Sequence, residues 1–421
     1  MKSMLQQPFG RILLVTLLVL LPSAALYLTR AATPVDLHID GDYPNARLQS
    51  VEYIDDKTVR IRAARDPDAP EGLWFRFRVT STTPVKPTFK LENFDELSQG
   101  NWHVVAPMFS VDGERWQAAE SSGVENGLLD RLQRKVNGGK AEFAFTAPFA
   151  ARAFEVAYST PYDLDTLNAW LATLPDDLAA IDAIGTLRSG RTIPLITFGA
   201  GAATAKQHVW IIGREHPGET PSSFFLQGLV DETLANLNAF PSTRFHVVPI
   251  LNVDGVAEGL YYRNPQSVDL AKDWQAQQSE ELRLLSRAMR PTLESSKVAL
   301  VINAHAANAP LNHFMIKPLR HLQSEAVYQT QQRLMKLLDD MHPQFSLENG
   351  IDMWDLPGIC GNYLPAKHGV YCLYIESNYN IGADGSRVTP DTLDAFGASM
   401  SRALARFLNE GAATNQEMEA N

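Results

Sequence analysis

The spacing of apolar residues changes near Pro161, and this change constrains the fold more than any other feature of the sequence. From about residue 36 to residue 159, apolar and polar residues alternate in short runs, for example at 74–79 and 154–158. A period of two is typical of antiparallel strands with one buried face, and Asp112-Gly113 supplies a hairpin turn. We therefore predict an N-terminal all-β sandwich. Further expected elements are strands at 59–63, 88–91, 103–105 and 142–145, a turn at 137–139 and a helix at 128–136.

After Pro161, continuous apolar runs alternate with stretches of helical periodicity. Such runs suit strands of a sheet that is covered on both faces, so this half predicts an α/β domain with a mixed sheet and helices on both faces. The expected strands are 208–212, 246–251, 298–303 and 370–375, and the expected helices are 163–174, 221–237, 279–290, 324–341 and 389–408.

The N-terminal segment, residues 1–32, predicts export. Lys2 and Arg11 precede an uncharged, mostly apolar stretch at 12–28, and Thr29 and Ala31 are small residues at the two positions that a signal peptidase inspects. An uncleaved membrane anchor is the alternative, because the stretch is close to the shortest that spans a bilayer. In both cases the rest of the chain leaves the cytoplasm for the periplasm or cell envelope. We divide it into a sandwich domain at 33–160, an α/β domain at 161–410 and a polar tail at 411–421.

Charge and cysteine content exclude two classes of site. With 37 basic and 48 acidic residues, a net charge of -11 and no run of Lys and Arg, we expect no nucleic-acid partner. Cys360 and Cys372 are the only cysteines, so any metal site must be built from histidines and carboxylates. The two cysteines are expected either to form one disulfide or to remain as two buried thiols.

A histidine and a glutamate lie three residues apart in the loop after the strand at 208–212. The segment runs His216-Pro-Gly-Glu219, and Thr220 and Pro221 then suit the cap and the first position of a helix. An imidazole and a carboxylate are the ligands that zinc takes where thiolates are absent. The alternative is that both side chains only bond loop backbone.

Polar side chains also follow the other expected strands. Because ligands collect beyond the carboxyl ends of strands in such sheets, we expect these groups to gather at one edge. A His/Glu/His set with a spare glutamate is hard to explain by structure alone. The groups are His305 after the strand at 298–303, Glu376 after 370–375, and Arg263 beyond 246–251.

The order and spacing of these motifs resemble the M14 zinc carboxypeptidases. The resemblance is strongest to the cytosolic-type carboxypeptidases, which trim glutamate from protein tails, and to their bacterial relatives. In the first half, residues 74–77 and 157–162 are similar to the β-sandwich that precedes the catalytic domain in that branch, so the resemblance covers most of 40–410. The motifs are His216-Pro-Gly-Glu219, Asn-Val-Asp-Gly-Val at 252–256 leading to Tyr262-Arg263, Val-Asp-Leu at 268–270 before Trp274, Ala304-His305 and Tyr-Ile-Glu-Ser at 374–377.

The resemblance implies a role for each of these residues. Glu376 is the expected general base, which takes a proton from a zinc-activated water and hands it to the leaving amine. Arg263 is expected to stabilise the oxyanion, and Asp269 matches the carboxylate that orients the first histidine. The implied cofactor is one Zn²⁺ ion with three protein ligands: His216, Glu219 and His305.

The sequence departs from the family where the substrate's terminal carboxylate binds. Ala271 and Lys272 replace an Asn-Arg pair; Ala271 has no side-chain donor, and Lys272 lacks the planar fork that grips a carboxylate twice. Lys272 is nevertheless an expected substrate-binding residue, and Tyr363 is a candidate for the tyrosine that closes over substrate. Two further departures, Val253 for a proline and Asn303 for an acid, remove no ligand.

Together these features predict an exported zinc metallocarboxypeptidase that hydrolyses a C-terminal or near-terminal peptide bond. One alternative is an exported amidase or deacylase that acts on cell-wall peptides, small amides or esters. Another is a non-catalytic binding protein on the same fold, and the change at Ala271-Lys272 is its only support. The expected partner is a peptide or small amide, and the membrane is contacted only through an uncleaved N-terminal segment. No sequence pattern indicates an oligomeric state.

Overall fold

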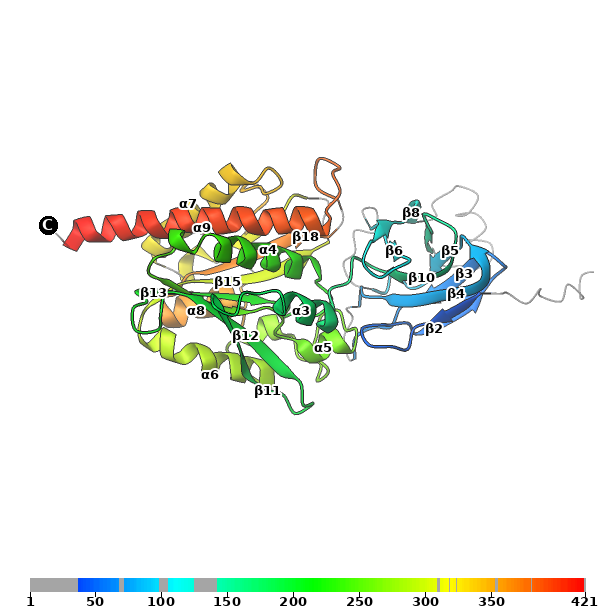
Figure 1. Cartoon of the computed structure of the whole chain (residues 1–421), viewed down its shortest axis with the longest axis horizontal. Coiled ribbons are helices and arrows are strands. Elements are labelled where there is room, and N and C mark those ends of the chain that lie inside the picture. The colour runs from blue at the N-terminus through cyan, green and yellow to red at the C-terminus, as the bar shows by residue number, and fades with distance from the viewer. Residues whose placement is uncertain are drawn as a thin grey trace, which may run out of the picture.

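The computed structural model describes residues 37–67, 72–97, 105–124, 142–308, 311–317, 319–322, 324–352, 355–379 and 381–419. A β-rich domain lies beside an α/β domain, as the sequence predicts (Figure 1). The expected export segment, the helix at 128–136, the turn at 137–139 and most of the strand at 103–105 lie outside the described residues and stay predictions. Within the described ranges, no helix combines the length and the hydropathy needed to cross a bilayer.

The first domain is a sandwich of two five-stranded sheets, which confirms the prediction. The sequence alternation leaves the direction of pairing open, and β3 pairs with β5 in parallel rather than in the expected antiparallel sense. One sheet has the order β1 (His38–Asp40), β4 (Arg76–Val85), β10 (Ala151–Ala157), β6 (Met108–Ser110) and β7 (Gln117–Ala118). The other has the order β2 (Ser50–Tyr53), β3 (Thr58–Arg62), β5 (Thr88–Leu91), β9 (Phe143–Thr146) and β8 (Ser121–Val124).

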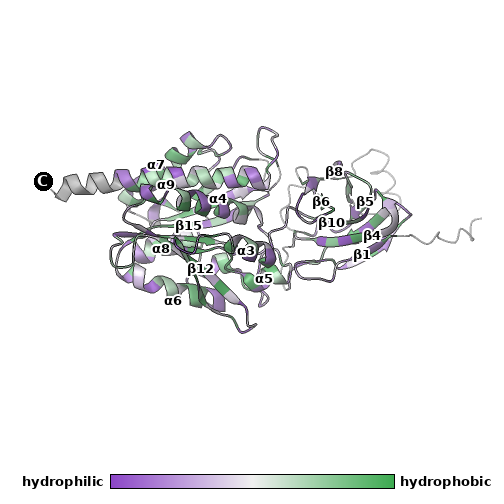
Figure 2. Cartoon of the chain, viewed as in Figure 1, coloured by the Kyte–Doolittle hydropathy of each residue, from purple (hydrophilic) through white to green (hydrophobic). Residues whose placement is uncertain are grey.

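Phenylalanines from both sheets form the sandwich core. Hydrophobic and hydrophilic residues alternate along β4, as expected for a strand with one buried face (Figure 2). The ring of Phe77 on β4 lies 5.2 Å from that of Phe89 on β5, and Phe89 lies 5.4 Å from Phe145 on β9. Because β4 belongs to one sheet and β5 to the other, the Phe77–Phe89 contact joins the two sheets, whereas Phe89 and Phe145 are neighbours within one sheet.

The second domain contains an eight-stranded mixed sheet. Strands β14, β13, β15 and β18 pair in parallel, whereas β12 and β16 run antiparallel to their neighbours in that group. The four predicted strands therefore form the parallel centre, and their carboxyl ends lie at one edge. The sheet order is β11 (Ala179–Thr186), β12 (Thr192–Gly199), β14 (Thr243–Val248), β13 (Gln207–Gly213), β15 (Val298–Ala307), β18 (Cys372–Asn378), β16 (Phe314–Lys317) and β17 (Ile351–Asp352).

Helices cover both faces of this sheet (Figure 1). One face carries α4 (Pro221–Ala235), α7 (Glu325–Met341) and α9 (Pro390–Glu419), and the other carries α6 (Glu280–Glu294) and α8 (Cys360–His368). Helices α4 and α9 cross closely because Gly228 and Gly397 have no Cβ. A Cβ on Gly228 would lie 2.2 Å from the carbonyl oxygen of Asp394, and a Cβ on Gly397 would lie 2.0 Å from that of Phe225. The connections contain α3 (Leu164–Leu171), α5 (Val253–Ala257), and the 3-10 turns η1 (Leu237–Ala239), η2 (Leu270–Lys272) and η3 (Arg320–Leu322).

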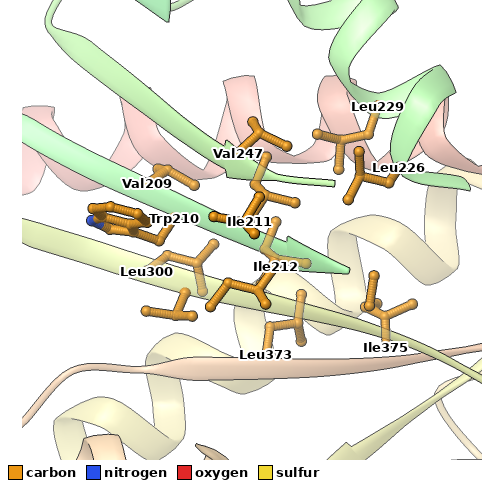
Figure 3. Close-up of a cluster of buried hydrophobic side chains, with 14 of the residues drawn as sticks. Val209, Trp210, Ile211, Ile212, Leu226, Leu229, Val247, Leu300, Leu373 and Ile375 are labelled. Atoms are coloured by element: carbon orange, nitrogen blue, oxygen red, sulfur yellow. The ribbon is translucent and has the colours of Figure 1, made fainter. Parts of the chain in front are cut away.

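The core of the second domain lies along the parallel strands. Figure 3 shows apolar side chains of β13, β14, β15 and β18 packed with Leu226 and Leu229 of α4. Trp210 of β13 instead donates its indole N–H to Thr292 of α6 at 3.0 Å, so β13 packs against helices on both faces. Burying each large apolar side chain stabilises the fold by roughly 1.5–3 kcal/mol. A shift of a strand along the sheet would expose several of these side chains, so the core holds the strand ends in place.

In the second domain, the sequence analysis missed the outer strands β11, β12, β16 and β17 and the short helices α5 and α8. Strand β11 has a single buried residue, Ala179, and therefore lacks the apolar run that marks the central strands. The strand expected at 246–251 runs from Thr243 to Val248 instead. The chain leaves the sheet early because the N–H of Leu251 donates to the carbonyl of Gly213 at 2.9 Å, in the loop after β13.

Candidate metal centre

A buried arginine shapes the loop between β13 and α4. Arg214 has a positive φ of 54°, and its guanidinium donates to the carbonyl of Tyr162 at 3.0 Å and to the hydroxyl of Ser223 at 2.9 Å. It also donates to the carbonyl of Pro217 from Nε at 3.1 Å. These bonds hold the loop in the conformation that presents the next residues to the sheet edge.

The helix that follows begins as predicted in one respect and not in another. Pro221 takes the first helical position. Thr220, however, makes no side-chain cap, because its hydroxyl is hydrogen-bonded to the hydroxyl of Ser159 at 2.9 Å. The expected capping role of Thr220 is therefore wrong, and its hydroxyl links the loop to the residue that follows the sandwich strands.

His216, Glu219 and His305 meet in one buried cluster, as the sequence predicts. Glu219 Oε1 lies 2.8 Å from His216 Nδ1, and Glu219 Oε2 lies 3.0 Å from His305 Nδ1. One ligand atom from each side chain lies within 4.8 Å of the others, so the three can hold one metal ion. Two imidazole nitrogens and a carboxylate oxygen suit zinc and leave a coordination position for water.

Two carboxylates bind the outer nitrogens of the histidines. Asp269 Oδ1 lies 3.2 Å from His216 Nε2, and Glu215 Oε2 lies 3.0 Å from His305 Nε2. A carboxylate only accepts, so each pair keeps a proton on Nε2, and once the imidazole is neutral its Nδ1 lone pair is directed at the metal position. The donor set therefore fits a zinc ion bound through both Nδ1 atoms.

Two tyrosine rings fix the planes of the imidazoles. Tyr262 stacks on His216 with ring centroids 3.9 Å apart, and Tyr374 of β18 stacks on His305 at 4.2 Å. Since both stacks are nearly parallel, at 20° and 14°, the rings cannot turn without losing contact. The ligand geometry is thus set before a metal binds.

Glu215 contacts the cluster, and the sequence analysis missed it. Its carboxylate accepts from Trp274 Nε1 at 2.7 Å and from Asn303 Nδ2 at 2.9 Å, in addition to its bond with His305. Asn303, noted above as a replacement for an acid, is therefore the donor to a carboxylate that comes from the next strand. The available signal was an acid directly before His216 at the end of a buried strand.

The charges within the cluster shift its pKa values strongly. Burial on its own lowers the pKa of each histidine, but Glu219 and the other bonded carboxylates outweigh it. The pKa of His216 lies well above its usual value, and that of His305 is raised to about 9. Burial opposes ionisation of Glu219, yet the two imidazoles lower its pKa to about 2. In the absence of a metal, the histidines therefore carry the protons that a cation would displace.

Glu376 lies beside the cluster because of the strand register. In the parallel pair β15–β18, Glu376 is the partner of His305. It is buried, and burial raises its pKa to about 8; the charge of Glu219 adds to the shift, and His305 and His216 oppose it. A bound cation favours the ionised form, which is the form that accepts a proton.

Lys272 is linked to the metal centre by an ion pair with Asp269, the carboxylate that binds His216. Its Nζ lies 2.6 Å from Asp269 Oδ2 and 5.4 Å from the centroid of the Tyr262 ring, and its side chain is half-exposed. Asp269 thus bridges His216 and Lys272. Ala271 is buried.

The side-chain contacts described for Arg263 and Tyr363, the two other predicted site residues, are with neighbouring loop and helix residues. Arg263 Nη1 donates to the carbonyl of Ser267 at 3.1 Å, within the loop that also carries Tyr262. The Tyr363 ring lies 6.5 Å from Trp274 and 6.0 Å from His368, and its hydroxyl accepts from Lys367 at 2.5 Å. These contacts include neither histidine ligand, so the role of Tyr363 toward substrate stays a prediction.

The two cysteines lie close to Glu215. Cys360 of α8 and Cys372 of β18 are buried free thiols with Sγ atoms 2.7 Å apart. Burial raises the pKa of Cys360 well above its usual value, and Cys372 and Glu215 contribute to the shift. Of the two expected arrangements, the structure has the buried thiols.

Comparisons with known proteins show what each half of the chain is similar to. The family model described as zinc carboxypeptidase, of the M14 peptidases, matches residues 167–312, and the model described as cytosolic carboxypeptidase N-terminal domain matches 39–148. Glu376 lies beyond the matched ranges. Cytosolic carboxypeptidase 6 of Mus musculus is 26% identical over 404 residues, which cover 88% of this chain and 72% of that protein.

Two solved structures share the fold. A metallo-carboxypeptidase from Burkholderia cenocepacia superposes with a TM-score of 0.77 at 21% identity, over 89% of this chain and 99% of that one. A metallo-carboxypeptidase from Pseudomonas aeruginosa, in complex with (2-guanidinoethylmercapto)succinic acid, superposes with a TM-score of 0.76 at 19% identity, over 89% and 99% of the two chains.

Zinc affinity is expected to rise with pH between about 6 and 9. Zinc binds neutral imidazoles, and the raised pKa values of His216 and His305 mean that each must lose a proton first. The association constant should rise by up to about tenfold per pH unit for each proton displaced, and level off only once both imidazoles have lost their protons. Competition with a chelator of known affinity measures this, and a pH-independent constant would contradict it.

Replacing Glu215 with Gln is expected to weaken zinc binding about 10- to 100-fold, because His305 loses the charged acceptor that orients it. Adding Asn303→Asp returns a carboxylate to the neighbouring strand and should restore part of the affinity. Asp231→Asn is the matched control, since Asp231 also accepts from an indole, Trp170 Nε1 at 3.0 Å. Chelator competition and the visible spectrum of the Co²⁺ form are the readouts. Parental affinity and spectrum in Glu215→Gln would limit that residue to a structural role.

Proposed function

Because the chain carries an M14 zinc carboxypeptidase domain behind a cytosolic carboxypeptidase N-terminal domain, we propose that it is a zinc-dependent carboxypeptidase that releases residues from the C-terminus of a peptide. One observation carries the proposal. The Nδ1 atoms of His216 and His305 converge on the carboxylate of Glu219 while Asp269 and Glu215 bind the opposite ring nitrogens. Such an arrangement suits a bound cation better than a set of structural hydrogen bonds.

Glu376 is the proposed general base. Zinc, when bound, polarises a carbonyl oxygen and activates water as the nucleophile. Glu376, buried and paired in register with His305, then accepts the proton of the water and passes it to the leaving amine. Its ionised state is required for the first step, so activity should depend on a bound cation to lower its pKa.

Arg263 is the proposed oxyanion donor. Its guanidinium is held by the carbonyl of Ser267, and Tyr262, the preceding residue, stacks on His216. A fixed positive charge stabilises negative charge that develops in the transition state more than charge in the ground state.

Lys272 is the proposed binding group for the substrate's terminal carboxylate. Ala271 is buried and has no side-chain donor, whereas the ammonium of Lys272 is half-exposed and is held next to the centre by Asp269. A single ammonium binds a carboxylate as a point charge, without the two parallel bonds of a guanidinium. We therefore propose a weaker preference for a free terminus than an arginine provides.

A peptide panel in free-acid and amidated forms tests this function. We expect single C-terminal residues to be lost from the free-acid peptides only. Glu376→Gln should lower kcat by about 10²–10⁴-fold with one zinc still bound. Lys272→Met should raise KM about tenfold, because it removes a charge contact made before the chemical step. Lys206→Met, at an exposed lysine, is the control. Mass spectrometry of the products is the measurement.

Two outcomes would overturn the proposal. Equal cleavage of acid and amide forms would make the protein an amide hydrolase that ignores the terminus, which is the first alternative named above. A zinc-loaded protein that cleaves no peptide and binds peptides equally well with Glu376→Gln would support the binding protein instead.

A further inference from the structure

The loop at 259–268 supports the metal centre but forms no helix or strand of its own. It carries Tyr262, which stacks on His216, and Arg263. The carbonyl of Tyr261 also accepts from the N–H of Gly218 at 2.8 Å, inside the His216–Glu219 turn. The path of this loop therefore decides where a ligand histidine and the proposed oxyanion donor lie.

One carboxylate from the sandwich domain binds three consecutive N–H groups of this loop. Asp66 Oδ1 accepts from Tyr261 N at 2.9 Å, and Asp66 Oδ2 accepts from Tyr262 N at 2.7 Å and from Arg263 N at 3.2 Å. Three successive backbone donors form a concave anion site, here filled by a side chain from another domain.

The burial of Asp66 is costly, so its position requires a compensating interaction. The residue is 4% exposed, and burial raises its pKa while the three backbone N–H groups lower it. A buried carboxylate is tolerated where it is hydrogen-bonded. The hydrogen bonds described for its side chain all come from the N–H groups of residues 261–263, so most of the compensation comes from the α/β domain, and the charge of Arg47 in the sandwich adds a smaller part.

Other sandwich residues hold the two ends of the same loop. At its start, Asn45 donates from its side chain to the carbonyl of Val256 at 2.8 Å, and a Cβ on Gly259 would lie 2.9 Å from the carbonyl of Ala46. At its end, the hydroxyl of Ser267 donates to the carbonyl of Pro67 at 2.9 Å. The loop is thus shaped by the sandwich along its length.

We infer that Asp66 is a positioning residue for the metal site, and that the sandwich domain is a working part of that site. Through three backbone hydrogen bonds, Asp66 sets the path of residues 261–263 and hence the places of the Tyr262 ring and the Arg263 guanidinium. The part that concerns Arg263 rests on the proposed function; the part that concerns the loop and the Tyr262–His216 stack does not.

Asp66→Asn tests the inference in the full chain loaded with zinc. We expect kcat on the fastest free-acid peptide to fall about 10- to 100-fold with KM changed less than about threefold, because a displaced oxyanion donor affects the transition state. In an Arg263→Ala background, Asp66→Asn should lower kcat by less than about a further threefold, since Asp66 acts on kcat through the Arg263 guanidinium. Hydrogen exchange of the 259–268 amides should quicken in Asp66→Asn.

Asn93→Ala is the matched control. Asn93 is fully buried in the sandwich, and its side chain bonds the N–H and the carbonyl of Ala63 at 3.1 and 2.9 Å, away from the loop. It should weaken the sandwich and leave both kcat and the exchange of 259–268 at parental values. Should Asp66→Asn fail to fold, Arg47→Met and Ser267→Ala, which remove exposed contacts to the same region, replace it and should raise the same exchange rates.

The inference is overturned if Asp66→Asn keeps parental kcat and parental exchange at 259–268, or if Asn93→Ala produces the same losses. Absence of peptidase activity in the parent protein would refute the proposed function alone, because the exchange measurement needs no substrate. Faster exchange limited to 259–268 in Asp66→Asn would support the inference in that case as well.

Discussion

The parallel pairing of β13, β15 and β18 is the constraint on which the site depends. It places His305 beside Glu376 and brings the turn that carries His216 and Glu219 to the same edge. The apolar side chains of these strands pack against helices on both faces of the sheet, and this packing fixes the strand ends. The charged groups are thus held in place by apolar contacts along the strands that carry them. The buried imidazoles and carboxylates then compensate one another, which makes the cluster stable without metal and ready to exchange protons for a cation.

Most of the site was predictable because its residues follow strands that can be recognised from apolar runs. His216, Glu219, His305 and Glu376 have side chains that suit the chemistry, and their order along the chain matches the topology. Glu215 was missed because an acid next to a ligand gives no indication of which histidine it serves; the pairing of β13 with β15 decides that it binds His305. The edge strand β11 was missed because it buries too little to leave a pattern.

Asp66 shows a further limit of sequence patterns. It lies 195 residues before Tyr261 of the loop that it binds, and nothing in the sequence around it indicates a role. The described contacts between the two domains include hydrogen bonds, such as those from residues 261–263 to Asp66, and the packing of Tyr261 and Tyr379 into the apolar cluster of the sandwich. Together with the outer carboxylates, these contacts mean that the ligands are oriented by groups drawn from both halves of the chain.

The most direct test of the account is a crystal structure of the zinc-loaded chain with anomalous diffraction recorded on both sides of the zinc absorption edge. The account predicts one anomalous peak per chain, about 2.0–2.2 Å from Nδ1 of His216, Nδ1 of His305 and an oxygen of Glu219. A zinc-loaded crystal with no peak at this position, or with the ion bound through the Nε2 atoms, would contradict it.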